Sequence, residues 1–159
     1  MTTQARSSSV VIFVDADACP VKTETIGVAA RHGVEVYVVS NGGIRPSPYP
    51  KAKTIVVDAG ADMADRWIIE NIRKSDILTT SDIPLSSLAI NIGATVILPD
   101  GEILGPNNIG IKNASRNLMS ELRSANPFHR EKGKQFTKLE RIRYINTLEK
   151  IIQTIKKSL

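Results

Sequence analysis

Near the start of the chain stands the stretch Val10-Val11-Ile12-Phe13-Val14-Asp15, an uninterrupted apolar run that ends in a carboxylate. Similar runs follow at Val34–Val39, Thr54–Val57, Asp76–Thr79 and Thr95–Leu98. They are short, rich in Val and Ile, and mostly lack apolar–polar alternation, which is typical of strands buried on both faces. The pattern therefore predicts a sheet of about five strands.

Helical segments separate most of these runs. Val21–Arg31 follows Pro20 and ends near Gly33, and two further helices are expected at Asp62–Lys74 and Pro84–Ile92. Strand–helix alternation of this kind predicts a mainly parallel sheet with helices on both faces. We therefore expect a single α/β domain over residues 10–159, a Rossmann-like arrangement in three layers. The proline-rich segment 41–53 is expected to be a loop or an extended crossover.

The C-terminal third is expected to be helical and basic, over residues of about 108–157. A helix is predicted at Asn107–Ser124, followed by a polar loop at 125–135. Thr137 and Glu140 form a capping box, and apolar residues then recur every three or four positions from Leu139 to Ile155. We expect the apolar stripes of both helices to face inward.

Composition excludes several classes of protein. The chain has 159 residues, 42% of them hydrophobic, and none of its apolar runs approaches the roughly 18 residues of a membrane span. Residues 1–9 lack the apolar centre of a signal peptide and are expected to form a disordered leader. Cys19 is the single cysteine, which excludes an internal disulfide and a cysteine-built zinc site. We expect a cytoplasmic protein with no membrane partner.

The charge is distributed unevenly. Residues 1–110 carry 9 Lys and Arg against 12 Asp and Glu, whereas residues 111–159 carry 12 against 4. A basic C-terminal third on an acidic body favours a polyanionic partner, with RNA ahead of DNA. A solvated basic helix explains the charge alone equally well. A homodimer also stays open.

Carboxylates gather where ligands bind in a parallel sheet, beyond the carboxyl ends of the strands. Asp15 and Asp17 follow the first strand, Asp82 follows the fourth, and Asp62 and Asp65 begin the helix after the third. Asp62 and Asp65 are three residues apart on one helix face, where two carboxylates repel by roughly 3 kcal/mol at an effective dielectric constant near 20. A divalent cation removes that repulsion. Oxygen ligands without His or Cys favour Mg²⁺ or Mn²⁺, ions that serve phosphoryl chemistry.

Each of these aspartates also has a purely structural interpretation. Asp62 and Asp82 suit N-cap positions, Asp65 suits a first helical turn, and Asp17 suits a cap of the helix after Pro20. Asp15 resists this interpretation best, because a carboxylate that ends an apolar strand loses hydration and gains little. We expect Asp15, Asp62, Asp65 and Asp82 to be catalytic, with Asp17 as an additional metal ligand.

Polar residues nearby are candidates for substrate binding. Lys22 lies one turn into a helix beside Asp15, while Asn41 and Ser81 end neighbouring strands. On the basic helices, Arg116, Lys138 and Arg141 are candidates for holding a phosphate backbone. Cys19, at a helix start, is a weak candidate nucleophile because no histidine has a recognisable partner spacing.

At these residues the sequence resembles the YaiI/YqxD family of bacterial proteins. The resemblance rests on Val14–Lys22, Ser40-Asn41, Gly60–Asp65, Thr79–Leu85, Pro99–Glu102, Asn108-Ile109, Arg116–Arg123 and Phe136–Leu148. That family is regarded as similar to the PIN-like nucleases, which implies a PIN-like fold with a carboxylate metal site. By this resemblance Asp15 corresponds to the acid that ends the first strand. Asp62 or Asp65 corresponds to the acid on the middle helix, and Asp82 to the acid of the late Thr/Ser-x-Asp element.

Three functions compete. The first is a Mg²⁺- or Mn²⁺-dependent phosphodiesterase that acts on RNA. The second is a nucleic-acid-binding protein without catalysis. The third is a haloacid-dehalogenase-like phosphatase, with Asp15 as nucleophile and Asp17 as acid–base, although Asp62 and Asp65 then precede the Thr79–Ser81 element instead of following it.

Overall fold

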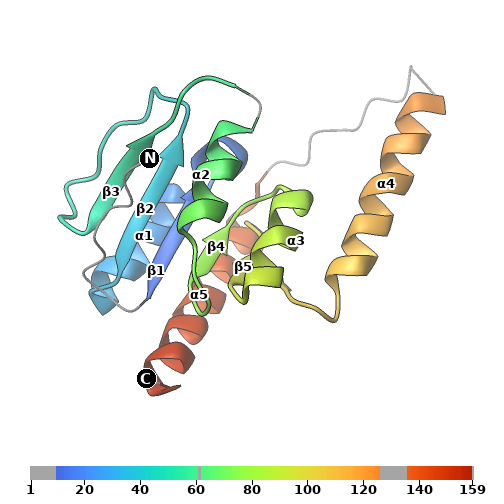
Figure 1. The fold of residues 1–159 in the computed structure, drawn as a ribbon. Helices are drawn as coiled ribbons and strands as arrows, with labels where there is room; N and C mark the ends of the chain where they lie inside the picture. Colours follow the sequence, from blue (N-terminus) through green and yellow to red (C-terminus); the bar gives the residue numbers. More distant parts are fainter. Residues whose placement is uncertain (1–9, 61, 126–135, 159) are drawn as a thin grey trace.

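The computed structural model describes residues 10–60, 62–125 and 136–158. The expected leader at 1–9 and most of the expected loop at 125–135 lie outside these residues. The described part forms one α/β domain built on a six-stranded sheet of order β3-β2-β1-β4-β5-β6 (Figure 1). The strands are β1 (Val11–Asp15), β2 (Glu35–Ser40), β3 (Ala52–Val56), β4 (Ile77–Thr79), β5 (Thr95–Ile97) and β6 (Ile103–Leu104). The helices are η1 (Ala16–Ala18), α1 (Lys22–His32), α2 (Met63–Asn71), α3 (Ile83–Ile92), α4 (Ile109–Ala125) and α5 (Lys138–Ser158).

The parallel sheet expected from the apolar runs is confirmed. Strands β1 to β5 pair in parallel, and β1 lies at the centre between β2 and β4. The sixth strand, β6, is an addition to the expected five: Gly101 turns the chain back at a φ of +91°, and Ile103 and Leu104 pair antiparallel with β5. Helix α2 ends at Asn71 instead of Lys74, because Ile72 is already extended.

Alternate residues of the central strands feed two separate cores. On one face Phe13, Tyr37 and Trp67 form an aromatic cluster, with ring centroids 5.3 to 6.0 Å apart, beneath α2 and α3. On the other face Ile12 and Val14 pack with residues of α1 and α5. Successive side chains of a strand point to opposite faces of the sheet, and both faces are covered here. Every residue of β1 is therefore buried, and its sequence shows no apolar–polar alternation.

Helix α5 begins at the expected capping box and closes the second core. Thr137 and Glu140 exchange the expected hydrogen bonds, with the Glu140 backbone N–H donating to Thr137 Oγ1 at 3.1 Å. Of the apolar residues after the box, Leu148 and Ile152 are buried, whereas Leu139 and Ile142 are exposed. Tyr144 is fully buried in their place, and its hydroxyl lies 2.6 Å from Thr25 Oγ1 of α1.

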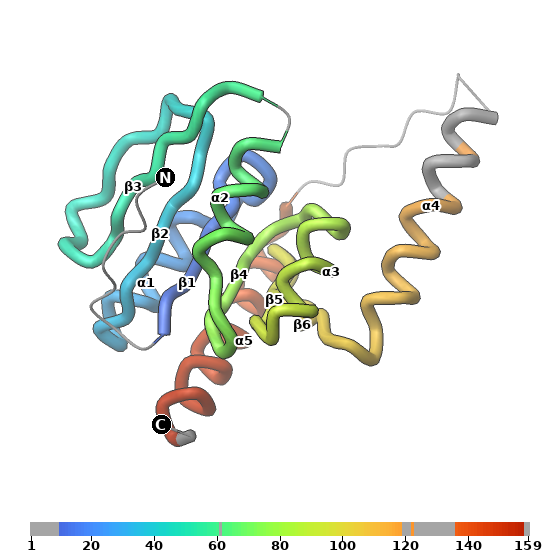
Figure 2. Tube along the Cα trace, viewed as in Figure 1, coloured from blue at the N-terminus to red at the C-terminus, as the bar shows by residue number. Residues whose placement is uncertain are grey.

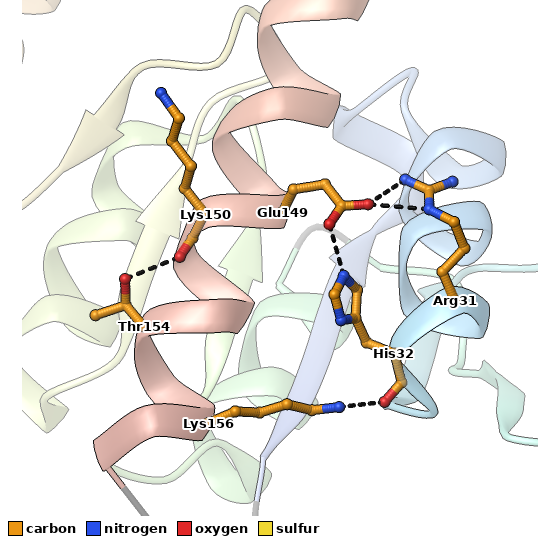
Figure 3. A network of polar contacts seen from close by, with 6 residues as sticks. All are labelled: Arg31, His32, Glu149, Lys150, Thr154 and Lys156. Carbon is orange, nitrogen blue, oxygen red and sulfur yellow. Dashed lines mark hydrogen bonds and ion pairs between the residues drawn. The ribbon is translucent and has the colours of Figure 1, made fainter.

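A polar network holds the C-terminal half of α5 against the end of α1 (Figure 3). Glu149 Oε2 lies 2.6 Å from His32 Nε2, and Glu149 Oε1 accepts from the guanidinium of Arg31. The Lys156 ammonium donates to the His32 carbonyl oxygen. These contacts lower the pKa of Glu149, chiefly through the hydrogen bonds from His32 and Arg31.

Helix α4 corrects one expectation, since its apolar stripe does not face the core. Ile111, Leu118 and Leu122 are 69%, 57% and 50% exposed. The helix packs on α3, where Asn113 donates to Ser87 Oγ, and Ile109 at its start packs against the first core. Most of its length stands apart from α2 and from the sheet (Figure 2). The opposite side of α4 makes the contact with α3, which leaves the stripe outward. Within the described residues, no helix is both long and apolar enough to cross a bilayer.

Candidate active site

The carboxyl ends of β1 and β4 mark the point where the strand order reverses. From β1 the chain proceeds outward through β2 and β3, and it then returns to β4 on the other side of β1. In open α/β sheets the crevice at such a switch point is where ligands bind. Asp15 is the last residue of β1, and Thr80, Ser81 and Asp82 follow β4 directly.

Asp15 is a buried carboxylate that is held by Thr80, the residue that directly follows the neighbouring strand β4. Its side chain is 3% exposed, and Oδ2 accepts a hydrogen bond of 2.8 Å from Thr80 Oγ1. The Thr80 hydroxyl oxygen in turn accepts from the backbone N–H of Asp82 at 3.0 Å. Burial raises the pKa of Asp15, the carboxylates of Asp82 and Asp17 raise it further, and the Thr80 hydrogen bond opposes this rise.

Asp65 interacts electrostatically with Asp15, Asp82 and Asp62. The pKa of Asp65 is raised to about 6, first by burial and then by the carboxylates of Asp82, Asp15 and Asp62. Helix α2 thus brings its N-terminal carboxylates toward the ends of β1 and β4. Asp15, Asp62, Asp65 and Asp82 therefore share one electrostatic environment, which we call the acidic cluster.

Asp62 and Asp82 both occupy N-cap positions, as the purely structural interpretation expects, but only one of them forms a capping hydrogen bond. Asp82 Oδ1 accepts from the backbone N–H of Leu85 at 3.0 Å and is the N-cap of α3. Asp62 occupies the N-cap position of α2 without any side-chain capping hydrogen bond, and it is exposed. The structural interpretation accounts for Asp82 in part and leaves Asp62 unexplained.

Asp17 differs from the cluster because both of its oxygens bind protein donors. Oδ1 accepts from Ser40 Oγ at 2.9 Å and Oδ2 from the backbone N–H of Asn41 at 2.8 Å. These bonds tie η1 to the end of β2, so the cap of α1 suggested by the sequence does not form. The Asn41 side chain stays exposed at the same rim.

The chemistry of the donor set fits a hard divalent cation, since all of it is carboxylate oxygen. Four carboxylates in one environment gain from a counter-charge, and the raised pKa values of Asp15 and Asp65 express that need. Across residues 10–60, 62–125 and 136–158, no group of three or more His, Cys, Asp or Glu side chains is arranged to hold a metal ion. The carboxylate oxygens of the acidic cluster match the ion in donor type and in charge.

The residues expected to bind substrate are only partly brought together. Ser81 is exposed beside the cluster, and its backbone N–H donates to Ala18 at 3.1 Å. Lys22 turns away to the Arg45 carbonyl oxygen at 3.4 Å. Lys138 and Arg141 are exposed at the start of α5, where the Arg141 guanidinium lies 5.7 Å from the Phe136 ring centroid. Arg116 is exposed on α4, the helix that stands apart.

The amino-acid sequence matches a known family over most of its length. The profile of the uncharacterised YaiI/YqxD family matches residues 13–154. The chain belongs to this family. A UPF0178 protein of Cereibacter sphaeroides strain KD131 is 47% identical over 89% of this chain and 88% of its own length. Another of Roseobacter denitrificans is 46% identical over 89% and 94%, and one of Agrobacterium fabrum is 43% identical over 92% and 95%. No solved structure matches.

Within this YaiI/YqxD chain, Cys19 lacks the features of a nucleophile. Its side chain is 8% exposed, and burial raises the pKa of the thiol to about 11. Its sulfur lies 3.7 Å from Thr79 Oγ1. Cys19 is part of the second core.

Sequence reasoning did not single out Thr80, the residue that holds Asp15. The available signal is a hydroxyl residue at the end of a neighbouring strand, two residues before another acid. It also did not single out Lys112, which pairs with Glu102 at 2.7 Å and lines a cavity beside the cluster. No local pattern marks Lys112, because α4 and the segment after β5 meet only in the folded chain.

Proposed function

We propose that this member of the YaiI/YqxD family is a Mg²⁺- or Mn²⁺-dependent phosphodiesterase that cleaves RNA. The single observation that carries the proposal is the acidic cluster at the switch point of the sheet. Burial raises the pKa values of both Asp15 and Asp65, and neighbouring carboxylates raise them further: Asp82 and Asp17 for Asp15, and Asp82, Asp15 and Asp62 for Asp65. Raised pKa values at a sheet crevice are typical of functional sites.

In this proposal Asp15, Asp65 and Asp82 hold the ion, with Asp62 at the exposed side. A bound Mg²⁺ or Mn²⁺ supplies an activated water and neutralises charge on the phosphate oxygens. Thr80 keeps the Asp15 carboxylate in one orientation. The capping bond to Leu85 does the same for Asp82. Asp17 positions the rim through Ser40 and Asn41 and is not required as a ligand.

The chain's own cations would bind the RNA backbone. Lys138 and Arg141 are exposed at the start of α5, whose first turn lines the same edge of the sheet as Ser81. Such residues hold phosphates regardless of base sequence. Ser81 offers a hydroxyl next to Asp82 for a phosphate oxygen or the attacking water.

The haloacid-dehalogenase-like alternative has weaker support. It needs Asp17 to donate and accept a proton at the substrate, but both Asp17 oxygens are occupied by Ser40 and Asn41. It also leaves Asp62 and Asp65 without a role. A binding protein without catalysis uses the same basic residues and is distinguished only by experiment.

The test is cleavage of 5′-labelled single-stranded RNA in Mn²⁺ by the wild type and by Asp15→Asn and Asp65→Asn variants. We expect both substitutions to reduce the rate at least 100-fold, and the matched control Asp58→Asn, an exposed acid after β3, to leave it unchanged. Binding in Ca²⁺ without cleavage in Mn²⁺ would replace the proposal with the non-catalytic function. Turnover of phosphomonoesters with a beryllium fluoride adduct on Asp15 would replace it with the phosphatase.

A further inference from the structure

A cavity of about 320 Å³ lies beside the acidic cluster, at the carboxyl ends of β4 and β5. Its walls come from five parts of the chain and include Pro20, Ser81, Asp100, Lys112, Phe136 and Glu140. Ser81 and Ile83 line it on either side of Asp82 in the sequence, so the cavity begins next to the cluster. A volume of this size lies at the lower end of small-molecule sites, which begin near about 300 Å³.

The apolar part of the wall suits a flat ring. Phe136 lines the cavity together with proline and aliphatic side chains, namely Pro20, Pro99, Ile83 and Leu98. The Phe136 ring packs on the second core, and the Arg141 guanidinium over the ring restrains it further. Bases of single-stranded nucleic acids stack on aromatic rings restrained in this way.

The polar part of the wall contains two carboxylates, Asp100 and Glu140, besides Ser81 and Lys112. Asp100 Oδ1 accepts from the Glu102 backbone at 2.9 Å, and Glu140 Oε1 accepts from Thr137 Oγ1 at 3.0 Å. In the described part of the chain, no donor is bonded to the second oxygen of either carboxylate. The Lys112 ammonium is already paired with Glu102. Among the described residues of the wall, two carboxylates face one cation that is already paired, a charge balance that disfavours a phosphate and favours a group rich in N–H donors.

We propose that this cavity binds a guanine base of the substrate RNA, an inference that rests on the proposed function. Guanine presents a ring N–H and an adjacent amino group along one edge, which is the pattern that an ionised carboxylate accepts. Asp100 or Glu140 accepts from that edge while the ring packs against Phe136. The phosphate next to the bound base then lies toward Ser81 and the acidic cluster.

The first test measures binding of free guanosine and inosine to the full chain by isothermal titration calorimetry without metal. Inosine lacks only the amino group, so we expect guanosine to bind about tenfold more tightly. Glu140→Gln keeps the capping box, which accepts Glu or Gln, and should abolish much of this preference. Asp100→Asn should do so if Asp100 is the acceptor. Equal binding of the two nucleosides by the wild type would overturn the proposal.

The second test uses labelled octamers of uridine that carry one guanosine or one inosine, with cleavage followed in Mn²⁺. Phe136→Ala should weaken binding of both octamers about tenfold, since the stacking platform is lost. The matched control Leu139→Ala, at an exposed position in the same turn, should change neither. Asp15-dependent cleavage without any guanosine preference would discard the guanine site and keep the proposed function. Guanosine preference without cleavage would keep the guanine site and discard the proposed phosphodiesterase function.

Discussion

The hydroxyl of Thr80 donates a hydrogen bond of 2.8 Å to the buried carboxylate of Asp15, across two adjacent strands and 65 residues of sequence. Both side chains are almost fully buried, so the Asp15 carboxylate has exchanged water for this hydroxyl. The same hydroxyl oxygen accepts from the Asp82 backbone. One side chain therefore positions two members of the acidic cluster.

Removing that hydroxyl should destabilise the fold. Thr80→Val has nearly the same shape but leaves the Asp15 carboxylate and the Asp82 N–H without this partner, which costs about 1–3 kcal/mol. Thr80→Ser keeps the hydroxyl and should cost less. Urea denaturation at pH 7 measures both free energies of unfolding. Equal losses in the two variants would mean that the methyl group of Thr80, and not its hydroxyl, matters.

Mn²⁺ should raise the melting temperature of the wild type, because a ligand bound only by the native state adds RT ln(1 + [L]/Kd) to its stability. Asp15→Asn should lose this response and should melt higher than the wild type without metal, since a buried charge beside Asp82 and Asp17 is removed. Differential scanning fluorimetry over a Mn²⁺ series gives both results. Asp58→Asn is the control. An equal shift in all three proteins would contradict a metal site at the cluster.

Gly101→Ala should destabilise the chain by about 2 kcal/mol or more. The residue has a φ of +91°, and an added Cβ would lie 2.9 Å from the Arg143 carbonyl carbon and 3.0 Å from the Tyr144 nitrogen of α5. Gly105→Ala is the matched control, because its Cβ would meet nothing within 4 Å. The melting temperature should fall by roughly 4–8 °C in the first variant only. Equal melting temperatures would mean that the backbone of α5 shifts to make room for the added Cβ without loss of stability.

The link between α1 and α5 predicts a pH dependence. The folded pKa of Glu149 lies below its ordinary value of 4.5, so its contribution to stability is present above pH 4.5 and is lost as the pH falls further. Glu149→Gln should therefore lower the melting temperature at pH 7, by roughly 2–4 °C for about 1 kcal/mol. The difference from the wild type should shrink below pH 4.5. Glu70→Gln, at an exposed position on α2, is the control and should show no such trend.

The exposed cations of α5 predict salt-dependent RNA binding. Replacing Lys138, Arg141 and Lys150, all exposed, with Gln should reduce the slope of log affinity against log salt by roughly 2, at about 0.7 for each cation on a single strand. Fluorescence anisotropy in Ca²⁺ measures this slope. The control is Arg73→Gln with Lys74→Gln, exposed in the loop before β4 at the opposite edge of the sheet. An unchanged slope in the triple variant would mean that these charges only solvate the helix.

The sequence by itself determined the features that depend on neighbouring residues. Apolar runs without alternation mark β1, β2 and β4, because a strand covered on both faces needs apolar residues at every position. The Thr137–Glu140 box marks the start of α5, because capping is satisfied within one turn. The positions of Asp15 and Asp82 at strand ends follow from the same runs, so the acids at this edge of the sheet were predictable.

Only the tertiary structure decided which of these features meet. The hydrogen bond from Thr80 to Asp15 and the contact of His32 with Glu149 join residues 65 and 117 positions apart, and no local pattern encodes either pair. In most amphipathic helices the apolar stripe is buried. In α4 the stripe is exposed, because the contact with α3 uses the other side of the helix. Periodicity shows that a helix has an apolar face, whereas the packing of its neighbours decides where that face points.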